Sequence, residues 1–163
     1  MDDRTKVIIL SDTHRQNGNF FKVLEKEGEY DMVIHAGDVE GSELTIERGA
    51  GCRVEMVMGN NDFFSNLPRE REFYIGRYKT WVTHGHDYYV SVGNEIIKAE
   101  ARARGVDILI YGHTHRPSIE SEGGLITINP GSLTYPRQDG RRPSYVVLYV
   151  FDSGIVEYEI KYL

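Results

Sequence analysis

Histidines, carboxylates and amides recur in this sequence where short apolar runs of strand type end. All six histidines lie in or beside such places, and the five segments concerned read SDTH, HAGD, GNND, THGH and GHTH. Imidazole nitrogen together with carboxylate and amide oxygen is a donor set that zinc, manganese and iron accept. The sequence therefore predicts a metal site assembled from five separate points of the chain.

Strands and helices alternate in the first third of the chain. Apolar runs at 6–11, 32–34 and 53–58 are typical of buried strands, and 18–28 and 42–49 are the predicted helices between them. This order predicts parallel strands with right-handed crossovers. Ligands bind at the carboxyl ends of strands in such sheets, so the segments after the strands are expected to converge.

The rest of the chain is expected to contain one long helix and six further strands. The helix spans 91–105, with Val92 and Ile96 on its apolar face. The strands are residues 71–75, 78–83, 107–111, 125–129, 144–151 and 155–161. The first two and the last two are expected to form antiparallel hairpins. The predicted fold class is α/β, with two packed mixed sheets flanked by helices.

The spacing within the polar segments suits metal binding. Asp12 and His14 are two residues apart, as are His113 and His115, and such pairs point to one side of an extended backbone. A single carboxylate between two clusters, Asp38, can bridge cations roughly 3.5–4 Å apart. Each segment alone has a simpler explanation as a helix cap, a turn or a polar loop. Their coincidence at five strand ends favours the metal site.

Composition and charge limit the class of protein. A length of 163 residues fits one domain, residues 1–163, and 40% hydrophobic with 27% charged residues is typical of a soluble globular protein. No apolar run approaches the roughly 20 residues that span a bilayer, and no signal-peptide pattern is present. The single cysteine, Cys52, excludes an internal disulfide framework, so a cytoplasmic location is expected.

The net charge of −6 argues against a protein that tracks long nucleic acid. Two divalent cations would reduce this negative charge and make the local field at the site positive. We therefore expect a small anionic substrate as the partner, with neither nucleic acid nor membrane.

The order D-x-H, GD, GNND, H and GHTH resembles the motifs of the calcineurin-like metallophosphoesterase superfamily. The short length and the NPGS segment at 129–132 resemble its small bacterial and archaeal phosphodiesterase branch, and the similarity runs from Val7 to the final hairpin. The resemblance implies a four-layer α/β/β/α sandwich. It also implies a phosphodiesterase that hydrolyses a small phosphate ester by attack of a hydroxide shared by two metals.

The resemblance further implies two ligand sets that share one carboxylate. The first set is Asp12, His14, Asp38 and His115, and the second is Asp38, Asn60, His84 and His113. Asp38, Asn61 and His84 are the candidate catalytic residues. Two divalent ions are expected, manganese first, with zinc, iron or nickel as alternatives that the same ligands would serve.

Asn61 departs from the pattern of many family members, which have histidine at this position to stabilise or protonate the leaving group. An asparagine donates a hydrogen bond but cannot act as a general acid near neutral pH. We therefore predict a preference for diesters or good leaving groups, and a modest rate.

Several polar residues beside the motifs have two interpretations each. His35 is expected to be structural or to support a ligand, and His86 either supports the site or lies at the surface. Asp62 either orients a neighbouring group or simply completes a turn. Arg116 and Arg137 are candidates for binding a phosphate oxygen, against simple solvation.

A non-catalytic scaffold is the main alternative from another class of function. One eukaryotic retromer subunit resembles this fold, serves mainly as an interaction module and has lost part of the metal set. The complete set here favours an enzyme, and the acidic charge weakens the case for a nuclease of the same superfamily. A homodimer or homotetramer is compatible with the sequence.

Overall fold

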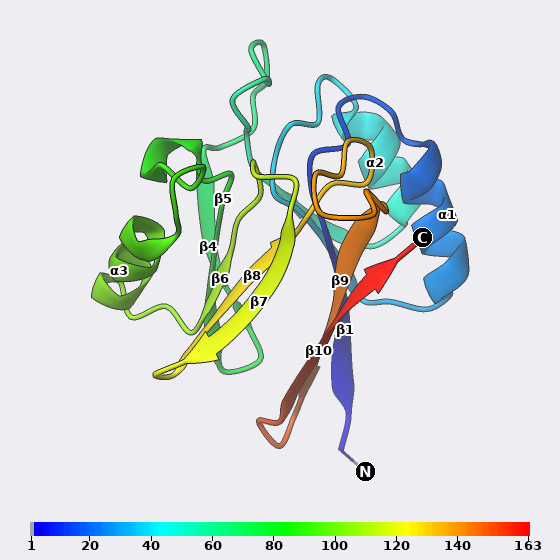
Figure 1. Ribbon diagram of the computed structural model, residues 1–163. Helices are drawn as coiled ribbons and strands as arrows, with labels where there is room; N and C mark the ends of the chain where they lie inside the picture. Colours follow the sequence, from blue (N-terminus) through cyan, green and yellow to red (C-terminus); the bar gives the residue numbers. More distant parts are fainter. Residues whose placement is uncertain (1) are drawn as a thin grey trace.

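Two five-stranded sheets form the centre of the computed structural model, which describes residues 2–163 (Figure 1). The first sheet consists of β1 (Arg4–Leu10), β2 (Met32–His35), β3 (Arg53–Met56), β9 (Ser144–Phe151) and β10 (Val156–Tyr162). The second consists of β4 (Glu70–Ile75), β5 (Tyr78–Thr83), β6 (Ile108–Ile110), β7 (Pro117–Glu122) and β8 (Leu125–Pro130). Their strand orders are β10-β9-β1-β2-β3 and β4-β5-β6-β8-β7.

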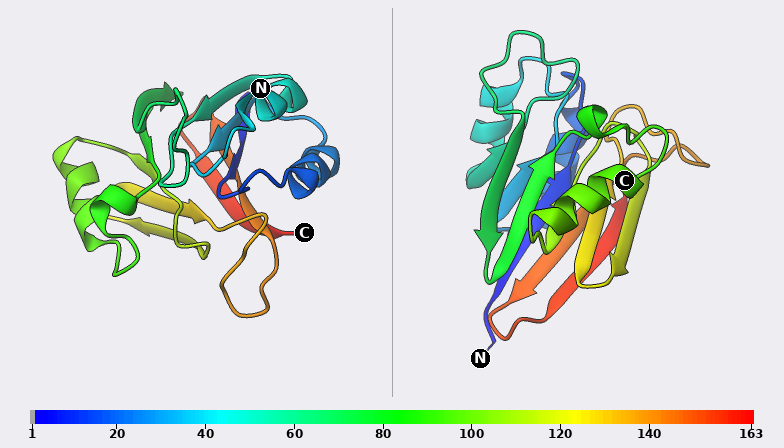
Figure 2. Two further views of the ribbon diagram at one scale, coloured as in Figure 1. Left: turned by 90° about the horizontal axis from the view of Figure 1, so that it is seen from above. Right: turned by 90° about the vertical axis from the view of Figure 1, so that its left-hand side faces the viewer.

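Helices cover the outer face of each sheet (Figures 1 and 2). α1 (Gly18–Glu27) and α2 (Glu43–Ala50) pack on the first sheet, and α3 (Glu95–Ala103) packs on the second. The predicted four-layer α/β/β/α sandwich is therefore confirmed. Within residues 2–163, no helix has the length and apolar character needed to cross a membrane.

Three apolar clusters fill the spaces between these layers. Val7 and Ile9 of β1 point between the two sheets, whereas Ile8 and Leu10 point toward α1 and α2. Because alternate residues of a strand face opposite sides, a strand buried on both faces is apolar throughout. The third cluster joins the second sheet to α3 through Trp81, Leu109, Ile97 and Ala101.

Parallel pairing brings several strand ends to one end of the sandwich. β1, β2 and β3 pair in parallel, as predicted, and β5, β6 and β8 are also parallel to one another. The loops after β1, β2, β3, β5 and β6 lie at the upper end of the molecule in Figure 1. All the predicted ligands belong to these five loops.

Two expectations about the second half were wrong. α3 begins at Glu95 rather than at 91, and Val92 is 92% exposed, because Gly93 and Asn94 favour a turn before the helix. Ile96 is also exposed, and the buried face of α3 consists of Ile97 and Ala101. The edge strand β7 was missed because its sequence, PSIESE, contains a single large apolar residue.

Candidate metal centre

Five loops bring the predicted ligands into one cluster. Asp12 and His14 follow β1, Asp38 follows β2, Asn60 follows β3, His84 follows β5, and His113 and His115 follow β6. Each ligand atom lies within 4 Å of at least one other, through the contacts described below.

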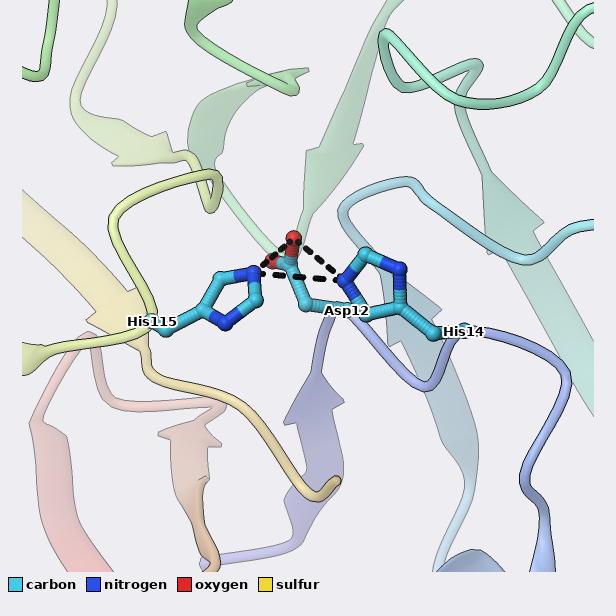
Figure 3. A group of neighbouring side chains, drawn as sticks. All are labelled: Asp12, His14 and His115. Atoms are coloured by element: carbon cyan, nitrogen blue, oxygen red, sulfur yellow. Dashed lines mark hydrogen bonds and ion pairs between the residues drawn. The ribbon is translucent and has the colours of Figure 1, made fainter. Parts of the chain in front are cut away.

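The first group consists of Asp12, His14 and His115, which point toward one another in Figure 3. Asp12 Oδ1 lies 3.1 Å from His115 Nε2 and 3.6 Å from His14 Nε2. The two nitrogens are 3.2 Å apart. Two imidazole nitrogens and one oxygen of the completely buried Asp12 carboxylate thus surround a single point.

The second group is built around Asp38 and His84. His84 Nε2 lies 3.4 Å from Asp38 Oδ2 and 3.8 Å from Asp12 Oδ1. His113 Nδ1 lies 3.3 Å from His84 Nε2 and 3.2 Å from Asn60 Oδ1. Asp38 Oδ2 is also 3.7 Å from His14 Nε2. The Asp38 carboxylate therefore lies between the two groups.

Backbone carbonyls orient two of the imidazole rings. His115 Nδ1 is 2.7 Å from the Tyr135 carbonyl oxygen, and His84 Nδ1 is 2.7 Å from that of Ala36. A carbonyl oxygen only accepts hydrogen bonds, so each Nδ1 donates its proton and each ring directs Nε2 toward the cluster. Outer partners of this kind are usual for histidines that bind metals.

Asp12 Oδ1 provides the test of whether a cation fits. This buried oxygen has no hydrogen-bond partner among the described residues, although three imidazole Nε2 atoms lie within 3.8 Å of it. A buried carboxylate needs positive charge beside it, which either protons on these rings or a cation bound in their place supplies, and imidazole and carboxylate are donors that such a cation accepts. The donor set and its arrangement therefore fit a divalent metal.

The electrostatics of the cluster also favour positive charge. Burial alone would lower the pKa of His84, but the Asp12 and Asp38 carboxylates raise it to about 9. Burial would raise the pKa of Asp12, but His84, His115 and His14 hold it well below its usual range. Two buried carboxylates thus create a field that attracts cations.

The family is shown by comparison with known proteins. The model of the calcineurin-like phosphoesterase superfamily domain matches residues 5–153. The chain belongs to this superfamily. A probable metallophosphoesterase from Methanocaldococcus jannaschii is 35% identical over 132 residues, which cover 79% of this chain and 68% of that protein.

Two solved structures are similar to this metallophosphoesterase along nearly the whole chain. A structure described as a novel archaeal phosphodiesterase has a TM-score of 0.77 at 25% identity, covering 98% of this chain and 100% of that one. Vps29 from Entamoeba histolytica, solved in complex with zinc, has a TM-score of 0.77 at 25% identity, covering 97% of this chain and 99% of that one.

The backbone of the metallophosphoesterase is left-handed at five of the predicted ligands. Their φ angles are 55° at Asp12, 49° at His14, 62° at Asp38, 70° at His113 and 59° at His115. The expectation that the two i, i+2 pairs lie on extended backbone is therefore wrong. Such conformations cost of order 1–3 kcal/mol each and persist where the surroundings impose them. Here Asp12 N and His14 N donate to the carbonyls of Gly37 and Asp38.

Two glycines let the carboxylates approach the neighbouring backbone closely. A Cβ atom at Gly59 would collide with the carboxylate and amide nitrogen of Asp38. One at Gly112 would collide with Ser11 Oγ and lie 2.7 Å from Asp12 Oδ2. Glycine is thus required as the first residue of both GNND and GHTH for packing of the loops against the two carboxylates.

Asp62 and His35 support the loops rather than the cluster itself. The buried Asp62 carboxylate accepts hydrogen bonds from the amides of Asp38 and Gly59, both at 2.8 Å, and of Glu40 at 2.6 Å. His35 is buried, its Nδ1 accepts from Gly37 N, and burial lowers its pKa to about 4. Asp62 therefore orients the backbone around Asp38, and His35 is structural.

Removal of the Asp62 carboxylate tests this support. Asp62→Ala leaves three buried or half-buried amides without their acceptor, so we expect unfolding to become easier by about 1–3 kcal/mol. Manganese affinity is expected to fall about 10–100-fold, as for other outer-shell partners. Chemical denaturation and calorimetric titration measure the two effects. The exposed Asp139→Ala is the matched control, and wild-type manganese affinity in Asp62→Ala would contradict this role.

The remaining predicted residues also lie near the cluster. Asn61 Nδ2 donates to Asp38 Oδ2 at 3.0 Å, and its amide N donates to Asp38 Oδ1 at 2.9 Å. The His86 ring is half-buried, with its centroid 5.4 Å from that of His84. Arg116 and Arg137 line a hollow beside His14 and His115. Sequence reasoning missed Tyr135 and Arg141 in this hollow, since no metal-ligand motif contains them.

Proposed function

We propose that this metallophosphoesterase is a phosphodiesterase that hydrolyses a small phosphate ester with two divalent cations. The observation that carries the proposal is the buried Asp12 Oδ1 with three imidazole nitrogens within 3.8 Å of it. The similarity to a protein described as an archaeal phosphodiesterase supports the choice of a diester. In the reaction, water forms a new P–O bond, the ester P–O bond breaks, and the leaving alcohol gains a proton.

Two sets of residues would hold the cations, with Asp38 common to both. One set is Asp12, His14, Asp38 and His115, and the other is Asp38, Asn60, His84 and His113. When bound, the cations supply positive charge for the phosphoryl oxygens and acidify water at the site. We propose manganese first, with zinc, iron or nickel as alternatives.

Side chains and amides of the chain hold the two carboxylates that would bind the cations. The Asp12 carboxylate accepts hydrogen bonds from Ser11 Oγ and from His113 N. The Asp38 carboxylate accepts two from Asn61, one from its backbone amide and one from its side-chain amide. Because Asn61 holds the shared carboxylate and cannot release a proton, it stabilises the site without protonating the leaving group.

A non-catalytic scaffold, the alternative weighed from the sequence, is the second candidate, since one similar structure is named Vps29 and not an esterase. The two functions differ in one outcome, which is metal-dependent turnover. The chain retains a donor side chain at all seven positions of the two sets, so the enzyme is the proposal. We likewise propose that the protein is located in a reducing cytoplasm, because the chain has a single cysteine and so no internal disulfide.

Hydrolysis of bis(4-nitrophenyl) phosphate by metal-stripped and reloaded protein tests the proposed function. We expect activity with manganese that disappears with a chelator and falls at least about 100-fold in His113→Ala, which removes a ligand in contact with Asn60 and His84. Asp139→Ala should keep full activity. If the protein hydrolyses no diester with manganese, zinc, iron(II) or nickel, the scaffold replaces the enzyme.

A further inference from the structure

A basic hollow lies directly beside the first group of predicted ligands. It has a volume of about 780 Å³ and is lined by His14 and His115 together with Arg116, Tyr135, Arg137 and Arg141. Three arginines therefore line the same space as two of the predicted metal ligands. This concentration of cations occurs in a chain whose net charge is −6.

The three arginine side chains of the basic hollow are unpaired. Within residues 2–163, none of them donates a hydrogen bond or lies within 4.0 Å of a carboxylate oxygen. Arg104, by contrast, forms ion pairs with Glu70, Glu72 and Glu100. The three arginines are exposed, so an anion in the hollow can reach guanidinium groups whose hydrogen-bond donors are free.

Hydrogen bonds couple the basic hollow to the predicted ligand His115. Arg116 is the next residue, and Arg137 N donates to the His115 carbonyl oxygen at 3.0 Å. The Tyr135 carbonyl accepts from His115 Nδ1, and the Tyr135 ring lies edge-on to His14 with centroids 5.3 Å apart. The backbone of Arg116 and Arg137 is thus held next to His115, so their side chains start beside the metal centre.

A second hollow, of about 600 Å³, lies on the Asn61 side of the centre and contains one arginine, Arg15, in place of three. Its lining includes the carboxylates of Glu40 and Glu43 and the rings of Phe63 and Phe64. Phe63 is 79% exposed, and Phe64 is fully exposed. Carboxylates disfavour a negatively charged group here, whereas the exposed rings favour an uncharged, apolar one.

We propose that the substrate is a phosphodiester in which one ester group carries a second anionic group, which Arg116, Arg137 and Arg141 bind. The other ester group is uncharged and lies on the Phe63–Phe64 side as the leaving group. Planar guanidinium groups bind phosphate or carboxylate through paired hydrogen bonds, so either anion satisfies the basic hollow. This inference rests on the proposed function, because it places the scissile phosphate at the metal centre.

A matched pair of chromogenic diesters tests the inference. Thymidine 5′-(4-nitrophenyl phosphate) has no second anion, and its 3′-phosphorylated analogue has one. We expect kcat/KM to be about tenfold or more higher for the analogue, the value of at least one charge-assisted hydrogen bond. The triple variant Arg116→Gln, Arg137→Gln, Arg141→Gln should lose this preference. Arg48→Gln, an exposed arginine on α2, should retain it.

Binding measured by calorimetry gives a readout that does not need turnover. Thymidine 3′,5′-bisphosphate is expected to bind about tenfold tighter than thymidine 5′-monophosphate to the wild type, and equally to the triple variant. Circular dichroism establishes that the variants are folded. An equal loss of preference in Arg48→Gln would assign the effect to net charge and overturn the inference.

The failure of this inference can be told apart from the failure of the proposed function. If bis(4-nitrophenyl) phosphate is hydrolysed but the 3′-phosphate brings no gain in rate or affinity, the anion site is wrong and the phosphodiesterase stands. If no diester is hydrolysed with any metal, the phosphodiesterase is wrong. The binding comparison then decides the anion site alone, and equal affinities for the two nucleotides would refute it.

Discussion

Asp12→Asn is expected to lower kcat/KM for bis(4-nitrophenyl) phosphate by at least about 1000-fold, the upper range for loss of one electrostatic group. The amide has the shape of the carboxylate but no charge. Asp12 Oδ1 is the buried oxygen on which the His14, His84 and His115 nitrogens converge. Removal of its charge therefore weakens the attraction for a cation at the centre of the first group.

Thermal unfolding with and without manganese separates this effect from a folding defect. Each manganese site, at 100 times its Kd, should stabilise the wild type by about 2.7 kcal/mol, and Asp12→Asn should lose the part that comes from the first set. Circular dichroism of the metal-free variant provides the control for folding. A variant that is stabilised by manganese like the wild type would show that Asp12 is not a ligand.

Asn61→His is expected to change how the rate depends on the leaving group. General acid catalysis contributes roughly 10²–10⁴-fold, and Asn61 cannot provide it. The wild type should therefore hydrolyse 4-nitrophenyl esters far faster than methyl esters of the same phosphate. Asn61→His places a titratable group beside the Asp38 carboxylate. The ratio of the 4-nitrophenyl ester rate to the methyl ester rate should therefore fall by at least about tenfold.

The ratio of rates is the readout because Asn61→His also removes the hydrogen bond to Asp38, which lowers all rates. Asn61→Ala removes the same bond without adding an acid, so it should keep the wild-type ratio. Equal wild-type rates for methyl and 4-nitrophenyl esters would mean that another group protonates the leaving alcohol.

Much of the fold was predictable because local patterns and global topology agree. The run at β1 is apolar at consecutive positions because both of its faces are buried, and the alternation with α1 and α2 implies parallel neighbours. Parallel strands end at one edge, so the convergence of Asp12, Asp38 and Asn60, which follow β1, β2 and β3, was also predictable. The edge strand β7 lacks such a pattern, since it is largely polar.

The site was less predictable where tertiary contacts determine the backbone. The left-handed conformations of Asp12 and His14 depend on bonds to Gly37 and Asp38, which are distant in sequence. In the same way, Tyr135 lies beside the centre because its carbonyl oxygen accepts a hydrogen bond from His115 Nδ1, 20 residues away in sequence. Local sequence propensities do not describe contacts between residues distant in sequence. No motif therefore marked Arg141 or Tyr135 as neighbours of the metal centre.

The number of metal ions bound per chain tests the central claim most directly. Metal-stripped protein, reloaded with manganese, desalted and measured by elemental analysis, is expected to contain two ions per chain. Asp38→Ala should contain fewer than one, because its carboxylate lies between His14 and His84 and belongs to both proposed sets. A wild type with no bound metal, or Asp38→Ala with two ions, would contradict a shared dinuclear centre.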